Sequence, residues 1–426
     1  MMVDHPGREQ PRASRQRVSE RANSVIAMAG RIVAGLFVAQ WVFFQLMLRN
    51  WDRVEVAARF FLGNDFAYLY NAAGYYLSGA SPYKETSFIP LPPALYLPMA
   101  LHHLSFWNAF IAFRVVTFVL VVVAIVWLSR QLKLNLLNTA LILAITLTYA
   151  PFYALLTGGN LDGLMMAFLV FACARSVAAS GSFLGLSIGT KFYSILLVPV
   201  LIVRRQWREL LWAIAVLCVL LLPFISYIPD AFASVFHRTS VLRLSGNESP
   251  AVLFIVLFGE KRIWAWRSCY VALWGGTLLI RLLADWVTAP SCDIDKERFR
   301  TLDYLPWMAG APVLVFTYTG TILLPVMARL LRNNQERRLF GSERIIVSGF
   351  LLTGIYPFVA SEILTGVAPL LHLHQGATEA LMNCIAPLGI SAILIGSGLQ
   401  AWRTFRASGR PGSILQRRAS EPNIAI

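Results

Sequence analysis

Long, nearly uninterrupted runs of apolar residues dominate the hydrophobic pattern of this chain. Each run is close to the ~20 residues that a helix needs to cross the hydrocarbon core of a membrane. The runs lack the period-two alternation of barrel strands, and in lipid only helices and closed barrels satisfy their own backbone. The pattern predicts an all-α, polytopic transmembrane helical bundle. The expected runs are about 25–48, 106–128, 136–156, 161–178, 181–203, 209–227, 263–283, 305–330, 345–364 and 380–399.

The ends of the chain differ from this pattern. Residues 1–24 are polar and basic and predict a cytoplasmic tail, and the first apolar run after them reads as an uncleaved signal anchor. Residues 25–406 are expected to form a single polytopic membrane domain. Residues 407–426, rich in Arg, Ser, Gly and Pro, predict a disordered cytoplasmic tail.

Composition supports the membrane assignment and removes one class of partner. Hydrophobic residues make up 57% of the chain, charged residues only 14%, and the formal net charge is +15. The basic residues cluster beside apolar runs, as at Arg204, Arg205 and Arg208, which is the positive-inside distribution of membrane proteins. We therefore expect no nucleic-acid partner.

A long outer loop, residues 49–106, follows the first predicted span. Aromatic and basic residues alternate in it, which is typical of short amphipathic helices lying in the membrane interface. The loop carries Asp65, an acidic residue in a chain with few of them. A proline-rich piece, Pro90–Ala94, cannot continue a helix and marks where the loop turns back toward the bilayer.

Two parts of the pattern conflict with a simple series of crossings. The run 181–203 has basic residues at both ends, which favours a re-entrant pair of half-helices broken near Gly189–Lys191, although an ordinary span with one misplaced basic loop is the alternative. After residue 260, the basic segments 296–300, 329–338 and 403–418 cannot all be cytoplasmic if each run crosses once. One element there must be re-entrant, or one basic segment must lie outside.

Several common chemistries lack their motifs. No phosphate-binding loop, zinc-peptidase helix, nucleophile elbow or dinucleotide fingerprint stands in a suitable context, and the six histidines and dispersed acids do not suggest a metal cluster. What remains is a group of polar residues predicted on the outer side of the membrane. Its members are Asp65, Asn160, Asp162, Lys191, Arg243, Asn247 and Glu248.

Sugar transfer from a lipid phosphate needs a carboxylate to accept a proton, cations to stabilise the phosphate, and an apolar groove for the lipid. The polar group contains candidates for the carboxylate and the cations, and the helical bundle is expected to provide the groove. Each residue also has a plainer interpretation. Asp65 and Asp162 are each favourable helix N-caps, and Lys191 is able to extend from a helix end to the interface. A lysine within an apolar run nevertheless favours a functional site, here contact with phosphate.

Part of the chain resembles a known family. The first-loop residues Asp65, Phe66, Tyr68, Gly79, Pro82, Tyr83 and Pro92, followed by Gly159–Asp162, Gly189–Phe192 and Asn247–Ser249, resemble the motifs of glycosyltransferase family 87, the polyprenol-phosphate-mannose-dependent mannosyltransferases of the GT-C superfamily. The resemblance covers about residues 60–255. Asn160, Asp162 and Glu248 depart from the family's Gln, Asn and Gln, and Phe316–Gly320 offers no histidine where the family has one.

The resemblance implies a GT-C-like bundle that transfers mannose, with inversion, from a polyprenyl-phosphate donor to a lipid or glycan acceptor. The reaction would occur at the outer face of the bacterial cytoplasmic membrane, with Asp65 as the catalytic base. Lys191 and Arg243 are the residues expected to bind the donor phosphate. We expect further substrate contacts from Asn160, Asp162, Asn247, Glu248 and Tyr68, and neither a cofactor nor a metal ion.

Two other classes of protein remain open. A lipid-linked glycan polymerase or ligase also has many spans and basic residues facing lipid phosphates, but its main loop is expected late in the chain. A transporter needs paired, interrupted helices at midplane. The break near Lys191 has no evident partner in the other half of the sequence.

Overall fold

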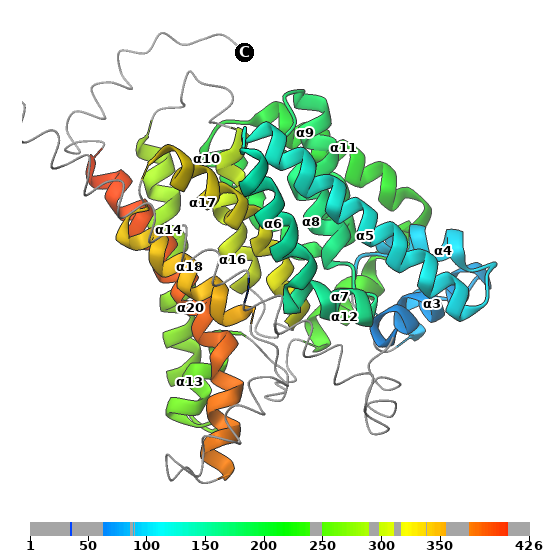
Figure 1. Cartoon of the computed structure of the whole chain (residues 1–426). Helices are drawn as coiled ribbons and strands as arrows, with labels where there is room; N and C mark the ends of the chain where they lie inside the picture. The colour runs from blue at the N-terminus through cyan, green and yellow to red at the C-terminus, as the bar shows by residue number, and fades with distance from the viewer. Residues whose placement is uncertain are drawn as a thin grey trace, which may run out of the picture.

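The computed structural model describes Gly35 and residues 63–85, 88, 90–238, 249–288, 298–310, 317–337, 339–354 and 375–407. Every regular element in these ranges is helical, which confirms the predicted all-α bundle (Figure 1). The predicted first span and cytoplasmic tail, and residues 408–426, lie outside the described residues, apart from Gly35.

The helices vary widely in length. The α-helices are α3 (Asn64–Leu77), α4 (Tyr96–Leu101), α5 (Phe106–Gln131), α6 (Leu136–Thr148), α7 (Ala150–Gly158), α8 (Asp162–Phe171), α9 (Val177–Thr190), α10 (Val198–Val203), α11 (Trp207–Leu221), α12 (Ile228–Arg238), α13 (Ala251–Phe258), α14 (Ile263–Val287), α16 (Leu305–Gly310), α17 (Leu324–Glu336), α18 (Gly341–Thr353) and α20 (Gln375–Ala407). Short 3-10 helices join them: η1 (Pro82–Lys84), η2 (Pro92–Leu95), η3 (Phe192–Leu197), η4 (Leu222–Tyr227), η5 (Phe299–Tyr304) and η6 (Thr317–Leu323).

Among the described residues, four helices are long and apolar enough to cross a membrane: Phe106–Gln131, Trp207–Ser234, Ile263–Val287 and Cys384–Arg406. The run expected over 136–156 is a bent pair, α6 and α7, with an angle of 50° between the two helices, so it reaches this length only if the pair forms one broken span. Only 11% of the apolar window of 207–234 is buried, against 61% for 384–406. The first of these therefore lies at the surface of the bundle and the second packs inside it.

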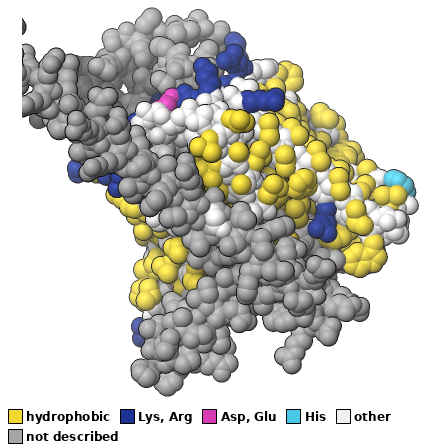
Figure 2. Space-filling model, viewed as in Figure 1, with side chains coloured by type: hydrophobic (Ala, Val, Ile, Leu, Met, Phe, Trp, Pro, Cys, Tyr) yellow, Lys and Arg dark blue, Asp and Glu magenta, His cyan; other side chains and the backbone are white. Residues whose placement is uncertain are grey.

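One end of the bundle collects the basic residues, and we call it the basic end. Arg298 donates to Oε1 of Gln131 at 2.9 Å, and Arg329 donates to the backbone oxygen of Phe299 at 2.6 Å, which ties three segments together there. Figure 2 shows Lys and Arg side chains gathered at the upper end of the view, above a broad hydrophobic surface. The basic end includes Arg130, Arg175, Arg204, Arg298, Arg329, Arg332, Arg337 and Arg403.

The segment 177–203 is re-entrant. α9 ends at Thr190, Lys191 is extended at the break, and η3 and α10 return to Arg204 at the basic end. α9 runs parallel to α11, because successive glycines of α9 meet successive residues of α11. A Cβ on Gly181 would lie 2.3 Å from the backbone oxygen of Glu209, and one on Gly185 would lie 2.6 Å from that of Ala213. Small residues at this four-residue spacing let two helix backbones touch.

A second re-entrant segment replaces the single span predicted over 305–330. η5 and α16 leave the basic end, and α17 returns to it, where Arg329 contacts Phe299 and Asp303. Between them, η6 packs against α7 and α8, deep in the bundle. Because the chain turns back here, the basic segments before and after this re-entrant segment lie at the same end of the bundle. A re-entrant element after residue 260 is one of the two outcomes that the charge pattern of the sequence left open.

The remaining helices complete the bundle around these two segments. α18 packs closely on α20, since a Cβ on Gly349 would lie 2.4 Å from the backbone oxygen of Gly389. α12 and α13 lie between the apolar runs predicted over 209–227 and 263–283. The described residues of the predicted first loop form α3, η1, η2 and α4, which are short helices as predicted.

Candidate active site

Asp65 is the second residue of α3, and backbone geometry fixes its position. The helix N-cap is Gly63, which adopts a left-handed conformation with φ 73° and donates its N–H to the backbone oxygen of Thr157 at 2.7 Å. This bond ties the start of α3 to the end of α7. Phe66, the next residue, is fully buried among aromatic rings such as that of Phe113, 5.0 Å away, and anchors the turn.

Two glycines at the end of α7 make room for this turn. A Cβ on Gly159 would lie 2.6 Å from Cβ of Phe66, closer than side chains can pack, and Gly159 also has φ 71°, a conformation that favours glycine. A Cβ on Gly158 would lie 3.2 Å from Oδ2 of Asp65. The glycine pair therefore lets the carboxylate of Asp65 lie against the backbone at the α7–α8 turn.

Asn160 links this carboxylate to the rest of the site. Its Nδ2 donates to Oδ2 of Asp65 at 2.8 Å. Its Oδ1 accepts from Nζ of Lys191 at 3.0 Å and from the backbone N–H of Asp162 at 3.1 Å. The two ends of one buried amide thus join a carboxylate on the first loop to a cation in the first re-entrant segment.

Asp162 is fully buried, and its carboxylate is surrounded by donors. Oδ1 forms an ion pair with Nζ of Lys191 at 2.7 Å and accepts from the hydroxyl of Tyr193. Oδ2 accepts from the hydroxyl of Thr319 at 3.3 Å. Since a buried charge is costly unless it is paired and hydrogen-bonded, these three contacts explain how a carboxylate is held inside an apolar bundle.

Lys191 lies at the break of the first re-entrant segment. Its backbone is extended, with φ −146° and ψ 124°, and the hydroxyls of Ser187 and Ser194 meet across the break at 2.8 Å. The ammonium is 5.3 Å from the centre of the Tyr193 ring. The side chain of Lys191 is 16% exposed, whereas that of Asp162 is fully buried, so the lysine is the member of the ion pair that other molecules can reach.

The structure thus brings four of the predicted residues, Asp65, Asn160, Asp162 and Lys191, into one connected cluster. Tyr68 lies one turn after Asp65 on α3 and is partly exposed. The other predicted residues, Arg243, Asn247 and Glu248, lie outside the described residues.

The capping alternatives do not match this geometry. Gly63 occupies the N-cap of α3, and Leu161 occupies the N-cap of α8. Asp65 and Asp162 both lie inside the first turns of their helices, where their side chains contact other elements. The ammonium of Lys191 is bonded to Asn160 and Asp162.

Sequence reasoning missed two residues of the cluster, Tyr193 and Thr319. Tyr193 stands two positions after Lys191, and its closeness to a lysine at a predicted break was the available signal. Thr319 carries no such signal, because only the return of the second re-entrant segment brings it to Asp162. In the part of the chain that the structure describes, no group of three or more His, Cys, Asp or Glu side chains could hold a metal ion.

The first loop is pinned beside the cluster by α12. Ser81 donates to Oδ2 of Asp230 at 2.6 Å, and the hydroxyl of Tyr83 donates to the backbone oxygen of Pro90 at 2.8 Å. Burial raises the pKa of Tyr83 above its ordinary value, and the negative charge of Asp230 raises it further. Tyr83 therefore remains a neutral hydrogen-bond donor that closes the loop.

Comparisons with known proteins place the chain in a family. The family model of glycosyltransferase family 87 matches residues 90–352. No curated protein and no solved structure matches the chain. The match extends beyond the expected limit near 255 and includes Asn160, Lys191 and Thr319, whereas Asp65 precedes it. Since the match covers more than half of a helical chain rich in membrane-length helices, the protein is a multi-pass membrane glycosyltransferase that belongs to glycosyltransferase family 87.

Proposed function

We propose that this protein transfers mannose from a polyprenyl-phosphate donor to a hydroxyl of a lipid or glycan acceptor, with Asp65 as the catalytic base. The observation that carries the proposal is the continuous chain of contacts from Asp65 through Asn160 to Lys191. It joins a partly exposed carboxylate to a partly exposed ammonium, the two charges that the reaction needs. The membership of the chain in a glycosyltransferase family supports this reaction over a transporter.

The chemistry requires both charges. Asp65 takes the proton of the acceptor hydroxyl while its oxygen attacks the anomeric carbon from the face opposite the phosphate. The bond between the anomeric carbon and the phosphate oxygen breaks, and the polyprenyl phosphate leaves. Because a phosphodiester with one negative charge becomes a phosphomonoester with two, a nearby cation stabilises the leaving group as the charge develops. A β-linked mannosyl donor gives an α-linked product.

Within this proposal, Lys191 is the cation closest to the base along the contact chain, and Arg243 is a second cation for the phosphate. Asn160 holds the carboxylate of Asp65, while Asp162 fixes Lys191. The remaining substrate contacts are assigned to Asn247, Glu248 and Tyr68.

The position of the site favours the outer face of the cytoplasmic membrane. Basic residues concentrate on the cytoplasmic side of membrane proteins, so the basic end of this bundle is assigned to that side. The Asp65 cluster lies away from it, where both re-entrant segments reach their turning points. A lipid-linked donor, unlike a nucleotide sugar, is available on the outer side.

The test is transfer by the purified protein in liposomes, with polyprenyl-phosphate mannose as the donor, a lipid and glycan extract as the acceptor, and mass spectrometry of the products. Asp65→Asn is expected to reduce transfer by roughly 10²–10⁴-fold, the usual contribution of a general base. Glu85→Gln is the control, because this carboxylate lies on the same loop and bonds Asn71. Undiminished transfer by Asp65→Asn would remove Asp65 from the mechanism, and transfer from a nucleotide sugar alone would exclude the proposed donor.

A further inference from the structure

A cavity of about 320 Å³ opens at the basic end, between the two re-entrant segments. Its walls come from α8, α9, η3, α10, the start of α11, η5 and the start of α16. The apolar lining includes Leu169, Leu184, Leu197, Leu201, Leu302 and Leu305, all of them buried. This volume lies in the range of about 300–1,000 Å³ that is usual for ligand sites.

Besides Ser180 in α9 and Thr301 in η5, the polar lining consists of charged and amide side chains near helix ends. Arg175 lies in the turn between α8 and α9, Gln206 and Glu209 at the start of α11, and Arg298 directly before η5. Arg175 is exposed, and the other three are partly exposed. The cavity thus has a leucine-lined interior and a mouth with two arginines and one glutamate, which leaves the mouth with a net positive charge.

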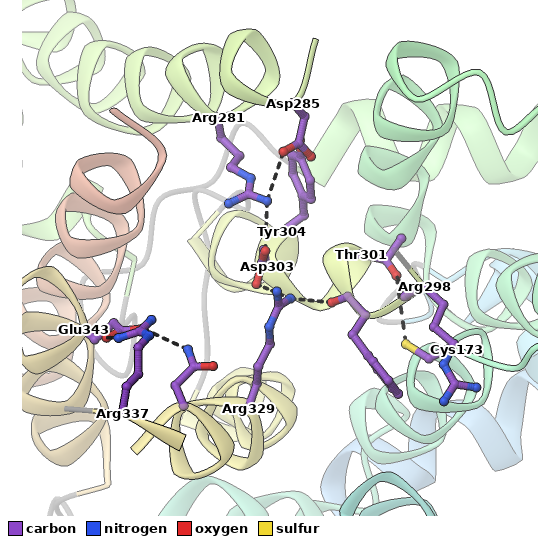
Figure 3. Close-up of polar contacts among 12 residues, drawn as sticks. Cys173, Arg281, Asp285, Arg298, Thr301, Asp303, Tyr304, Arg329, Arg337 and Glu343 are labelled. Carbon is purple, nitrogen blue, oxygen red and sulfur yellow. Dashed lines mark hydrogen bonds and ion pairs between the residues drawn. The ribbon is translucent and has the colours of Figure 1, made fainter. Parts of the chain in front are cut away.

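The η5 wall of this cavity is held rigidly. Asp303 accepts from Arg281 at 2.8 Å and also pairs with Arg329, so η5 is clamped between α14 and α17 (Figure 3). On the opposite side of η5, the hydroxyl of Thr301 meets the thiol of Cys173 at the end of α8, 3.9 Å away. These contacts hold η5, whose Leu302 lines the cavity, while Arg298 directly before η5 donates to Gln131 of α5 at 2.9 Å.

We propose that this cavity binds an anionic phospholipid, with one hydrocarbon chain among the leucines and the phosphate between Arg175 and Arg298. Basic pockets between transmembrane helices on the cytoplasmic side are suited to anionic head groups. The buried apolar interior suits a hydrocarbon chain, which a free phosphate or a soluble anion would leave empty. The site is separate from the Asp65 cluster and does not depend on the proposed reaction.

The position of the cavity gives the lipid a structural role. Its lining joins the start of the first re-entrant segment, at Val177, to the start of the second, at Arg298. These two segments meet again at Asp162, through Lys191 and Thr319. The turning points of these two segments contribute to the Asp65 cluster. A bound lipid therefore connects the two segments at their other end, the basic end.

The test is native mass spectrometry of the purified full-length protein, titrated with phosphatidylglycerol and with phosphatidylcholine of the same chain length. We expect phosphatidylglycerol to bind more tightly, and each of Arg175→Gln and Arg298→Gln to weaken it about fivefold, the effect of one basic residue near a lipid surface. Arg208→Gln is the matched control, since this exposed arginine lies in the first turn of α11 but does not line the cavity. It should leave the affinity unchanged.

A second variant tests the hydrocarbon chain. Leu184→Phe fills the interior and keeps both arginines, so it should weaken phosphatidylglycerol binding while the melting temperature without lipid stays near that of the native protein. If Leu184→Phe does not fold, Leu201→Phe provides the same test, because Leu201 also lines the interior. Equal binding of the two lipids, equal losses in Arg208→Gln and Arg298→Gln, or full competition by glycerol phosphate would each overturn the proposal.

Discussion

Nδ2 of Asn160 lies 2.8 Å from Oδ2 of Asp65 and donates a hydrogen bond to it. The amide has only one orientation that suits its surroundings, because its other end accepts from the ammonium of Lys191 and from the backbone N–H of Asp162. Rotation by 180° would direct the N–H groups at a cation and the amide oxygen at a carboxylate. The carboxylate of Asp65 is thus oriented in part by a residue 95 positions later in the chain.

Replacement of Asn160 tests this dependence. Asn160→Leu removes the donor to Asp65, and we expect kcat to fall by about 10²-fold, as for a reacting group displaced by roughly 1 Å. The control is Asn138→Leu, because the amide of Asn138 bonds Gln335 at the basic end. Transfer rates in liposomes, normalised to folded protein, provide the measurement. A native kcat in Asn160→Leu would show that Asp65 holds its position without the amide.

Replacement of Lys191 separates its contribution to stability from its contribution to transfer. Lys191→Met leaves the carboxylate of Asp162 buried without its cation, and loss of one partner of a buried ion pair costs about 3–5 kcal/mol of stability. We expect a lower melting temperature in detergent together with lost transfer. The double variant with Asp162→Asn removes the stranded charge and should recover most of the stability without recovering transfer. Recovery of transfer as well would limit Lys191 to a structural role.

Tyr193→Phe removes one of the hydrogen bonds to the buried Asp162. A hydrogen bond to a charged group contributes about 1.5–3 kcal/mol, so we expect a loss of stability of that size and a lower kcat. Tyr304→Phe is the matched control, because the hydroxyl of Tyr304 bonds Asp285 at 2.8 Å at the basic end. Tyr304→Phe should lower the stability by about as much as Tyr193→Phe does, and it should leave the kcat of the folded protein unchanged. Equal effects of both variants on kcat would contradict the assignment of Tyr193 to the site.

Gly159→Ala tests the close approach of α3 to the α7–α8 turn. The new methyl group would meet Phe66 at 2.6 Å in a left-handed backbone conformation, and together these effects should cost about 3 kcal/mol. Gly79→Ala supplies the control, since Gly79 has φ +78° but a Cβ added there would meet nothing within 4 Å. It should cost only about 1 kcal/mol. Similar melting temperatures for the two variants would show that the contact with Phe66 is unimportant.

Much of the fold could be predicted from the apolar pattern, because membrane-length helices are encoded locally. The break at Lys191 was also predictable, since arginines on both sides of one apolar run cannot share a face of the membrane if the run crosses it. The second re-entrant segment was not, because residues 305–330 read as one long apolar run although η6 and α17 divide it. A charge conflict was visible there, but it did not identify the element responsible.

The candidate site shows a similar division. Asp65, Asn160, Asp162 and Lys191 could be named because polar residues between or within apolar runs are conspicuous in sequence. Their connections could not be, because they depend on close backbone contacts such as that of Gly159 with Phe66. Thr319 could not be found at all by local pattern, since a threonine in an apolar stretch is ordinary.

The contact of Thr319 with Asp162 has a consequence for biosynthesis. Membrane helices enter the bilayer in order as the ribosome makes them, and chains fold from the N-terminus during synthesis. Lys191 and Tyr193 are therefore the first partners available to the carboxylate of Asp162. The hydroxyl of Thr319 becomes available only after 157 residues beyond Asp162 have been translated. A nascent chain shorter than this is expected to lack one of the contacts of the candidate site, so this site is completed only after the second half of the chain has been inserted.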